Sequence, residues 1–390
     1  MRLALDYRPA LFGTGGIARA VRELARALAR RGDLELHLFG HALRGVDARE
    51  GGGMTAVRGE DAGDARVTLH RSRLPGRSLP WLSHLGLDAS RLSGSCPLFH
   101  WTDYVYPPVR RGVRVVQTVH DLAFVDDPEA HGVEGGARLL TRFETALARA
   151  DLVLCPSEAT ARALRRLGRP LPPVRVVPFG ADHVDARAAD RAAGRREAAR
   201  LLGTDEPYLV CLATIEPRKN HASLLAAWRS LGDERPPLLV VGAPGWDTAL
   251  VQRELRRPQP RLAWTGVLPD RDLTDLVAGA RALVYPSRLE GFGFPPMEAL
   301  QLGVPVLAGD CEALREHLGA AALYADGRDP EVLAPALARI HADEGLGRAL
   351  VAAWQARRGR YRWDLAAAAH AEAYAACLGA TAREVGGGAR

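Results

Sequence analysis

Short apolar runs alternate with segments whose apolar residues recur at helical spacing along most of the chain. Runs of about four to seven apolar residues predict strands buried on both faces, and the periodicity between them predicts amphipathic helices. Regular alternation of strand and helix is typical of a doubly wound parallel sheet. Strands are expected at residues 3–7, 34–39, 98–101, 113–119, 151–155, 174–180, 208–214, 238–242, 262–266, 281–287 and 305–308.

The runs fall into two arrays, and 390 residues exceed what one compact core accommodates. We therefore expect an α/β fold of two Rossmann-like domains with doubly wound parallel sheets, over residues 1–185 and 186–362. The stretch at residues 181–203, rich in Ala, Arg and Asp, is expected to connect them. Residues 44–66, rich in Gly, Arg and Asp, predict a loop.

Composition narrows the class of protein. Hydrophobic residues make up 47% of the chain and charged residues 25%, as in soluble globular proteins. No apolar stretch approaches the roughly 20 residues of a membrane span, and the amino terminus lacks a signal-peptide core. The five cysteines are scattered, and none form a CxxC pair. We expect a cytoplasmic protein with free thiols, without disulfides or structural zinc.

The placement of basic residues is more informative than the modest net charge of +6. Arg19, Arg22, Arg26 and Arg30 fall on one face of a helix expected at residues 17–31. Such a stripe indicates either a solvated face or contact with an anionic partner, such as the inner membrane surface or a phosphorylated acceptor. Nucleic acid is not an expected partner.

The densest candidate chemistry follows the apolar run at residues 281–287. The loop there contains Glu290 and two glycines, and a Pro-Pro pair is expected to open a helix with Glu298 just inside its first turn. Glycines let a ligand approach the backbone, a helix N terminus favours an anion, and a carboxylate accepts two hydrogen bonds from a vicinal diol. The alternative is that Glu298 is an ordinary first-turn acid that stabilises the helix dipole.

Two adjacent cations follow another expected strand of the second array. Lys219, beside Arg218, is the single lysine among 52 basic residues. Because the carboxyl ends of parallel strands meet at one edge of a sheet, both cations are expected to gather there with Leu268, Glu290 and Glu298. Two cations and a helix N terminus indicate a diphosphate, and Glu298 indicates a ribose diol. The second domain is therefore expected to bind a nucleotide.

The first array contributes a glycine loop and a histidine. Residues 13–18 fit the dinucleotide fingerprint loosely, but the first glycine follows its strand late and the next strand ends without an acid for a ribose. A loop that cradles a phosphate or admits a substrate is the better interpretation. His120 follows an expected strand and belongs in the ligand crevice, unless it is a satisfied structural histidine. Asp121 either orients its imidazole or caps the next segment.

Five motifs spread over nearly the whole chain are Gly13-Thr-Gly-Gly-Ile17, Thr118-Val-His-Asp121, Val176-Val-Pro-Phe-Gly180, Glu216-Pro-Arg-Lys-Asn220 and Glu290-Gly-Phe-Gly-Phe-Pro-Pro-Met-Glu298. In this order they resemble the retaining glycosyltransferases of family 4, whose architecture is called GT-B. The phrase TIEPRKN most resembles the mannosyltransferase-B-like branch. One departure is Phe-Gly-Ala-Asp at residues 179–182, where many members have Asn-Gly-Val-Asp, so the role of that turn is open.

The resemblance implies a role for most of the singled-out residues. Arg218 and Lys219 would hold the donor diphosphate, and Glu298 the ribose hydroxyls. Glu290 would contact the donor sugar, and His120 would lie beside that sugar as it transfers. These residues apart from Glu298 are the candidate catalytic set. The implied donor-binding set also includes Gly15, Gly16, Leu268, Gly291, Phe292, Gly293 and Phe294.

The resemblance places the donor in the second domain and the acceptor in the first, across a cleft. Asp103, Tyr104 and Asp121 are the candidate acceptor contacts. A helix at about residues 363–378 would pack back on the first domain, and residues 381–390 would form a frayed tail.

The expected activity is transfer of a hexose from a nucleoside diphosphate sugar to an acceptor hydroxyl, with retention of anomeric configuration. By resemblance the donor is GDP-mannose, with UDP- or dTDP-sugars and a natural-product or polysaccharide acceptor as alternatives. Neither metal nor cofactor is expected, because cationic side chains and a helix dipole can stabilise the departing diphosphate. The rival functions are a GT-B nucleotide-sugar epimerase and a non-catalytic sugar-nucleotide sensor.

Overall fold

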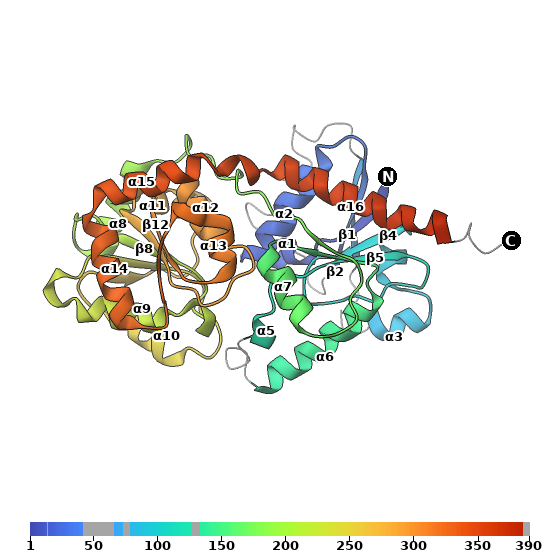
Figure 1. The fold of residues 1–390 in the computed structure, drawn as a ribbon, viewed down its shortest axis with the longest axis horizontal. Helices are drawn as coiled ribbons and strands as arrows, with labels where there is room; N and C mark the ends of the chain where they lie inside the picture. The colour runs from blue at the N-terminus through green and yellow to red at the C-terminus, as the bar shows by residue number, and fades with distance from the viewer. Residues whose placement is uncertain (14, 42–65, 73–78, 127–132, 385–390) are drawn as a thin grey trace. The chain divides into compact units, whose positions relative to one another are not determined.

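The computed structural model describes residues 1–13, 15–41, 66–72, 79–126 and 133–384 (Figure 1). The chain divides into two compact units. Unit 1 is drawn from residues 1–122, 137–180 and 362–390, and unit 2 from residues 123–136 and 181–361. The sequence had predicted domain boundaries after residues 185 and 362, whereas the structure has them after residues 180 and 361. None of the described helices combines the length and apolarity needed to cross a membrane.

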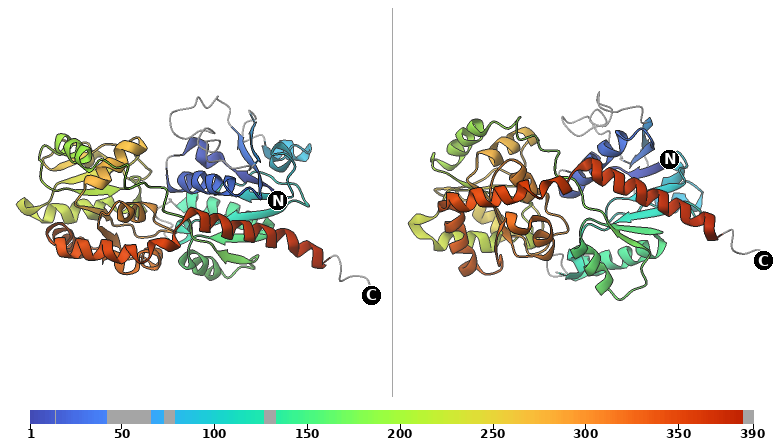
Figure 2. Two further views of the ribbon diagram at one scale, coloured as in Figure 1. Left: turned by 90° about the horizontal axis from the view of Figure 1, so that it is seen from above. Right: turned by 45° about the horizontal axis from the view of Figure 1, so that its top comes forward.

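Within the described residues, unit 1 contains a seven-stranded parallel sheet with helices on both faces (Figures 1 and 2). The strand order is β3-β2-β1-β4-β5-β6-β7. Strands β1 to β3 extend the sheet to one side, and β4 to β7 extend it to the other, so the strand order reverses between β1 and β4. The strands are β1 (Arg2–Asp6), β2 (Glu35–His41), β3 (Arg66–Ser72), β4 (Leu98–Trp101), β5 (Arg114–Thr118), β6 (Leu152–Cys155) and β7 (Val174–Val176). The helices of this half of the chain are α1 (Arg8–Phe12), α2 (Gly16–Ala29), α3 (Leu79–His84), α4 (Ala89–Leu92), α5 (Ala123–Asp126), α6 (Val133–Arg149) and α7 (Glu158–Arg166).

Unit 2 has a six-stranded parallel sheet in the part of the chain that the structure describes, in the order β10-β9-β8-β11-β12-β13. Its strands are β8 (Leu209–Leu212), β9 (Leu238–Val241), β10 (Leu262–Trp264), β11 (Ala282–Tyr285), β12 (Val306–Gly309) and β13 (Leu323–Ala325). Its helices are α8 (Arg191–Leu202), α9 (His221–Ser230), α10 (Ala249–Leu255), α11 (Asp270–Gly279), α12 (Phe294–Gln301), α13 (Glu312–Leu318), α14 (Pro330–Ala342) and α15 (Glu344–Gln355). Short 3₁₀ turns η4 (Pro217–Lys219), η5 (Gly232–Glu234), η6 (Gly319–Ala321) and η7 (Arg358–Arg360) complete the unit.

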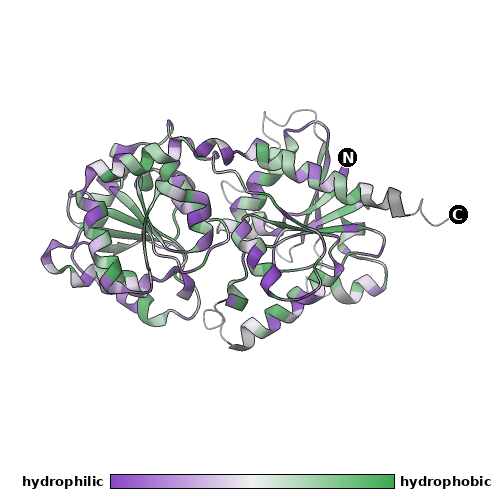
Figure 3. Ribbon diagram, viewed as in Figure 1, coloured by the Kyte–Doolittle hydropathy of each residue, from purple (hydrophilic) through white to green (hydrophobic). Residues whose placement is uncertain are grey.

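The apolar pattern explains why these segments became strands and helices. Figure 3 shows mainly hydrophobic strands, flanked by helices in which hydrophilic and hydrophobic residues are mixed. In α2, Val21, Leu24 and Leu28 are all buried, as their helical spacing predicts. Helix α7 starts where the Ser157 hydroxyl accepts a hydrogen bond from the backbone N–H of Thr160 at 3.0 Å.

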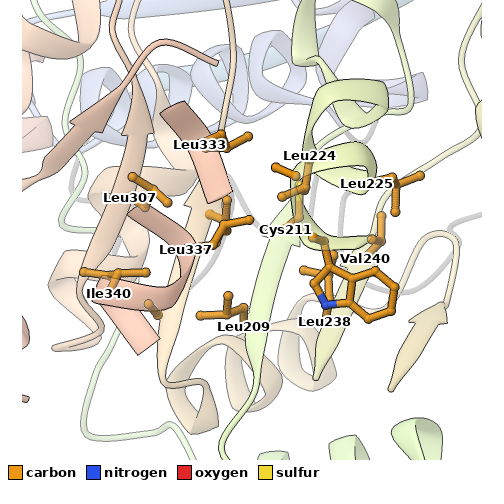
Figure 4. Close-up of a cluster of buried hydrophobic side chains, with 14 of the residues drawn as sticks. Leu209, Cys211, Leu224, Leu225, Leu238, Val240, Leu307, Leu333, Leu337 and Ile340 are labelled. Atoms are coloured by element: carbon orange, nitrogen blue, oxygen red, sulfur yellow. The ribbon is translucent and has the colours of Figure 1, made fainter. Parts of the chain in front are cut away.

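The core of unit 2 joins strands that are distant in sequence (Figure 4). Leu209 and Val240 come from the neighbouring strands β8 and β9 and are completely buried. Helix α14 covers the same cluster with Leu337 and Ile340, and α9 covers it with Leu224. This packing holds the carboxyl ends of the strands, and the loops that follow them, in fixed positions.

Three of the sequence expectations need correction, and a fourth cannot be compared. The edge strands β3 and β13 were not predicted, because both are only partly buried and β13 has only three residues. The strand expected at residues 174–180 ends at Val176, before Pro178, which has no N–H to donate. Helix α12 begins at Phe294, so Glu298 is its fifth residue and lies beyond the first turn. The loop expected at residues 44–66 lies outside the described residues except for Arg66.

The C-terminal helix α16 (Trp363–Glu384) packs on α2 and β5 of unit 1. It continues to Glu384, so residues 381–384 are helical where a tail was expected. The turn that departs from the family pattern meets the start of this helix: the rings of Phe179 and Trp363 lie 5.9 Å apart. A Cβ atom on Gly180 would lie only 2.4 Å from the Trp363 backbone nitrogen. The turn therefore serves as the docking point for α16.

Replacing Gly180 with alanine is expected to destabilise unit 1 by about 1–3 kcal/mol, because the new methyl group overlaps backbone that cannot move without displacing α16. Urea unfolding followed by tryptophan fluorescence measures the change. Gly379→Ala is the matched control: Gly379 lies in α16, a Cβ atom added there would have nothing within 4 Å, and the substitution should be neutral or slightly stabilising. Equal effects of the two substitutions would contradict the docking role of Gly180.

Candidate functional site

The 3₁₀ turn η4 presents the two adjacent cations at the carboxyl end of β8. Asn220 ends this turn in the left-handed conformation, with φ of 61°, which asparagine tolerates better than most residues. Its side-chain amide donates to the backbone carbonyls of Gly327 and, at 3.5 Å, of Pro286. Asn220 thereby ties η4 to the loops that follow β11 and β13, and this fixes the position of Lys219.

Lys219 is buried, and its ammonium is held by two side chains of unit 2. Nζ donates to the hydroxyl of Tyr285 at 2.8 Å and to a carboxylate oxygen of Glu290. Nζ also lies 5.1 Å from the centre of the Tyr285 ring. Burial lowers the pKa of Lys219, and the charge of Arg218 lowers it further, while Glu290 and Glu216 act in the opposite direction.

Glu290 is the centre of this cluster. Its carboxylate accepts hydrogen bonds from Lys219, from the Ser287 hydroxyl at 2.5 Å and from Arg218 Nη1 at 3.5 Å. Burial by itself would raise the pKa of Glu290, but Lys219 and Arg218 lower it to about 2. The pKa values of Glu290 and Lys219 therefore both fall, and the geometry favours a charged pair because each partner has good hydrogen bonds.

Arg218 lies between two carboxylates. Its Nε is 2.6 Å from Glu216 Oε1, and Nη1 is 3.5 Å from Glu290 Oε2 and donates to the carbonyl of Leu289 at 3.2 Å. The sequence correctly predicted that Arg218, Lys219 and Glu290 share one edge of the sheet. It did not predict that Glu216, Tyr285 and Ser287 support them.

Glu298 lies on α12, the helix that follows this loop. It is 5% exposed, and its Oε1 is 3.0 Å from the Nε2 atom of His183, which comes from the segment before α8. The N cap of α12 is Gly293, whose φ of 88° lies in the left-handed region that favours glycine. Helix α12 thus carries both a glycine-capped N terminus and, one turn further on, the buried carboxylate of Glu298.

The remaining donor-binding candidates take different positions. The rings of Phe292 and Phe294 pack together with centroids 4.8 Å apart and are buried, so a donor contact from either would use its backbone. Leu268 is half-buried and follows β10, three strands from β11 in the sheet order. In unit 1, Gly15 caps α2 and Gly16 begins it, and both are exposed.

His120 lies at the carboxyl end of β5 in unit 1 and is held by the backbone. Its Nε2 is 2.7 Å from the carbonyl of Thr102, which can only accept, so Nε2 carries the proton. Burial lowers the pKa of His120. Asp121 was expected to orient this imidazole or to cap the next segment, and both alternatives stay predictions. The Asp121 backbone exchanges hydrogen bonds with the hydroxyl of Tyr104.

Asp103, a candidate acceptor contact, is anchored within its own loop. Its carboxylate accepts from the backbone N–H of Val105 at 2.5 Å and lies 3.6 Å from Arg8 Nη2. Arg8 is paired with the fully buried Asp6, whose pKa burial raises to about 6 against the opposing effect of Arg8. The sequence interpretation missed this pair, which fixes the loop that supports His120.

Two of the four arginines in the α2 stripe make side-chain contacts within unit 1. Arg22 donates to the carbonyls of Ala10 and Gly13 at 3.4 and 3.5 Å, and Arg26 pairs with Glu23 at 2.5 Å. The solvated face and the anionic partner both stay predictions for this stripe. In the described residues, no cluster of His, Cys, Asp or Glu is arranged to hold a metal ion.

Two family descriptions together match most of the chain. Glycosyltransferase Family 4 matches residues 14–185, and Glycosyl transferases group 1 matches residues 195–357. A D-inositol 3-phosphate glycosyltransferase of Streptomyces bingchenggensis is 30% identical over 95% of this chain and 87% of its own length. The chain belongs to the GT-B glycosyltransferases.

Further relatives of this glycosyltransferase are similar over the full length. O-antigen chain mannosyltransferase B of Escherichia coli is 28% identical over 93% of this chain and 97% of its own length. Sucrose-phosphate synthase from Thermosynechococcus elongatus shares the fold with a TM-score of 0.74 at 22% identity, covering 97% of this chain and 100% of its own. HepE of Anabaena, solved in complex with UDP-glucose, has a TM-score of 0.70 at 16% identity and covers 96% and 99%. The two-unit fold and the family predicted from the sequence are thereby confirmed.

Proposed function

We propose that this glycosyltransferase moves a hexose from a nucleoside diphosphate sugar to an acceptor hydroxyl, with retention of anomeric configuration. The observation that carries the proposal is the cluster of Arg218, Lys219 and Glu290 at one edge of the unit 2 sheet, together with the buried carboxylate of Glu298 on α12, the helix that follows the Glu290 loop. Mannose from GDP-mannose is the proposed donor, because a relative that is similar over the full length is named a mannosyltransferase.

The two cations would stabilise the departing diphosphate. In the structure their charges are balanced by Glu216 and Glu290. An ammonium has three N–H donors, and Tyr285 and Glu290 account for two of those on Lys219, so the third is available to a phosphate oxygen. Preorganised charges of this kind cost no reorganisation when the leaving group develops negative charge.

Transfer would proceed on one face of the sugar. The bond from the anomeric carbon to the phosphate oxygen breaks, and the acceptor oxygen bonds to the same carbon from the same side. The acceptor proton passes to the leaving phosphate oxygen, so no side-chain base is required. His120 would contact the transferring sugar through the part of its imidazole that Thr102 does not hold.

A transfer assay tests this proposal. The enzyme is supplied with GDP-mannose, UDP-glucose or dTDP-glucose, each with and without a panel of hydroxyl acceptors. Acceptor-dependent release of nucleoside diphosphate supports the proposal, and the preferred donor identifies the base; a UDP-sugar is the alternative because HepE of similar fold was solved with UDP-glucose. Donor conversion to an epimer without acceptor would favour the epimerase, and no turnover of any donor would favour the sensor.

Activity is expected to persist after exhaustive chelation, since Arg218, Lys219 and the N terminus of α12 are proposed to stabilise the diphosphate without a metal ion. The measurement compares initial rates before and after treatment with EDTA, followed by gel filtration into metal-free buffer. A rate lost on chelation and restored only by Mg²⁺ or Mn²⁺ would contradict metal-independent transfer.

A further inference from the structure

The contact between His183 and Glu298 joins the chain segment that enters unit 2 to helix α12. Nε2 of His183 lies 3.0 Å from Oε1 of Glu298, although 115 positions separate them in sequence. The side chains are only 10% and 7% exposed, so water competes weakly for either group. Both residues belong to unit 2, and the contact is therefore internal to it.

The imidazole of His183 is held in place by its surroundings. Its ring meets the ring of Phe294 edge to face, with centroids 6.0 Å apart, and Phe294 is the first residue of α12. Two residues earlier in sequence, the backbone N–H of Ala181 donates to the carbonyl of Tyr361 at 2.9 Å. His183 therefore approaches Glu298 from a backbone that is itself anchored, against a ring carried by the same helix as Glu298.

A fixed hydrogen bond matters because the last torsion of a glutamate is broad. The terminal χ angle of Glu has no sharp rotamer, so an unsupported carboxylate turns freely about it. A vicinal diol donates two hydrogen bonds and is held best when both carboxylate oxygens face it. Holding the carboxylate in one orientation before the ligand arrives removes part of the ordering cost of binding.

We propose that His183 is a positioning residue for ribose recognition, in which its Nε2–H group orients the Glu298 carboxylate towards the 2′ and 3′ hydroxyls of the donor nucleotide. The inference rests on the proposed function, because it takes the nucleotide to bind at Glu298. Through His183, the segment before α8 would take part in donor recognition. A purely structural His183 would instead hold that segment in place without regard to the ribose.

The test measures binding of two ligands that differ only in the ribose. GDP and 2′,3′-dideoxy-GDP, or the uridine pair if only UDP binds the parent enzyme, are titrated calorimetrically into the parent protein and into His183→Leu, His183→Gln and Glu298→Ala. We expect His183→Leu to weaken GDP binding by about 10-fold, as for loss of a hydrogen bond to a charged group, and to leave the dideoxy ligand within about twofold. His183→Gln, whose amide can donate in place of Nε2, should keep most of the GDP affinity.

Unchanged binding of the dideoxy ligand also shows that His183→Leu has folded with its site intact. Glu298→Ala should remove the difference between the two ligands. If His183→Leu weakens both ligands equally, or neither, the positioning role is wrong while the proposed function stands. If the parent protein binds dTDP but neither GDP nor UDP, the positioning role is wrong while the proposed function stands. If it binds none of the three, both proposals fail together.

Discussion

Replacing Lys219 with arginine is expected to lower kcat/KM by about 30- to 1000-fold, nearly as much as Lys219→Ala, although arginine keeps the positive charge. Losing one charge-assisted contact to a leaving group raises the transition-state free energy by about 2–4 kcal/mol. Lysine carries a compact ammonium on a flexible stem, whereas arginine carries a wide planar fork. The prediction is therefore that shape, as well as charge, decides function at this position.

The surroundings of Lys219 explain why the fork should not fit. The residue is 8% exposed, its Nζ reaches the Tyr285 hydroxyl and Glu290, and the Tyr285 ring lies beside it. A guanidinium in that space would meet the ring or the neighbouring Arg218, which already contacts Glu290. Overfilling a packed interior forces side chains out of their rotamers.

Steady-state kinetics of the parent, Lys219→Arg and Lys219→Ala proteins measure this effect, with thermal unfolding to confirm that each is folded. The two variants should lie within a few-fold of each other. If Lys219→Arg keeps most of the parent activity, only charge matters at this position, and the single lysine of the chain has no steric role.

Glu290→Gln is expected to destabilise unit 2 by about 3–5 kcal/mol and to lower kcat more than it changes KM. The substitution preserves size but removes the counter-charge of two cations in a buried cluster, and breaking a buried pair by removing one partner has this order of effect. The loss in kcat follows from the proposed contact of Glu290 with the transferring sugar, which is made in the transition state. Urea unfolding and steady-state kinetics measure the two effects.

The same substitution should change how stability depends on pH. The pKa of Glu290 is about 2 in the folded protein, below its ordinary value of 4.5. A lowered carboxylate pKa contributes stability that is fully present above pH 4.5 and is lost as pH falls towards 2. The parent protein should therefore lose stability over this interval more steeply than Glu290→Gln.

Glu197→Gln provides the matched control for Glu290→Gln. Glu197 pairs with Arg200 on the exposed face of α8, where solvent screens the interaction, so no measurable change in stability is expected. If Glu290→Gln behaves like this surface control, the buried cluster does not depend on its central carboxylate, and the electrostatic description of the site is wrong.

The sequence predicted the parts of this structure that depend on local pattern. Alternating apolar runs located the central strands of both sheets, because strands buried on both faces leave an uninterrupted apolar signal. The same rule placed Arg218, Lys219 and Glu290 at one sheet edge, where the structure brings them into contact. The edge strands β3 and β13 were missed because they are partly exposed.

The supporting contacts could not be predicted, because they join residues that only the fold brings together. Tyr285 was recognised as part of an apolar strand, and nothing local shows that its hydroxyl holds Lys219 from 66 positions away. His183 was counted within a connecting segment, and its contact with Glu298 depends on where that segment meets α12. Phe179 was noted as a departure from a family pattern, and its packing on α16 became visible only in the structure.

The central claim is that the loop-and-helix edge of unit 2 binds the nucleoside diphosphate of a sugar donor. Calorimetric titration of GDP, UDP and dTDP into the parent protein, Lys219→Ala and Glu298→Ala tests it most directly. We predict that one of the three ligands binds the parent protein and that both substitutions weaken its binding. Failure of all three ligands to bind, or equal affinity in the parent and both variants, would contradict the claim.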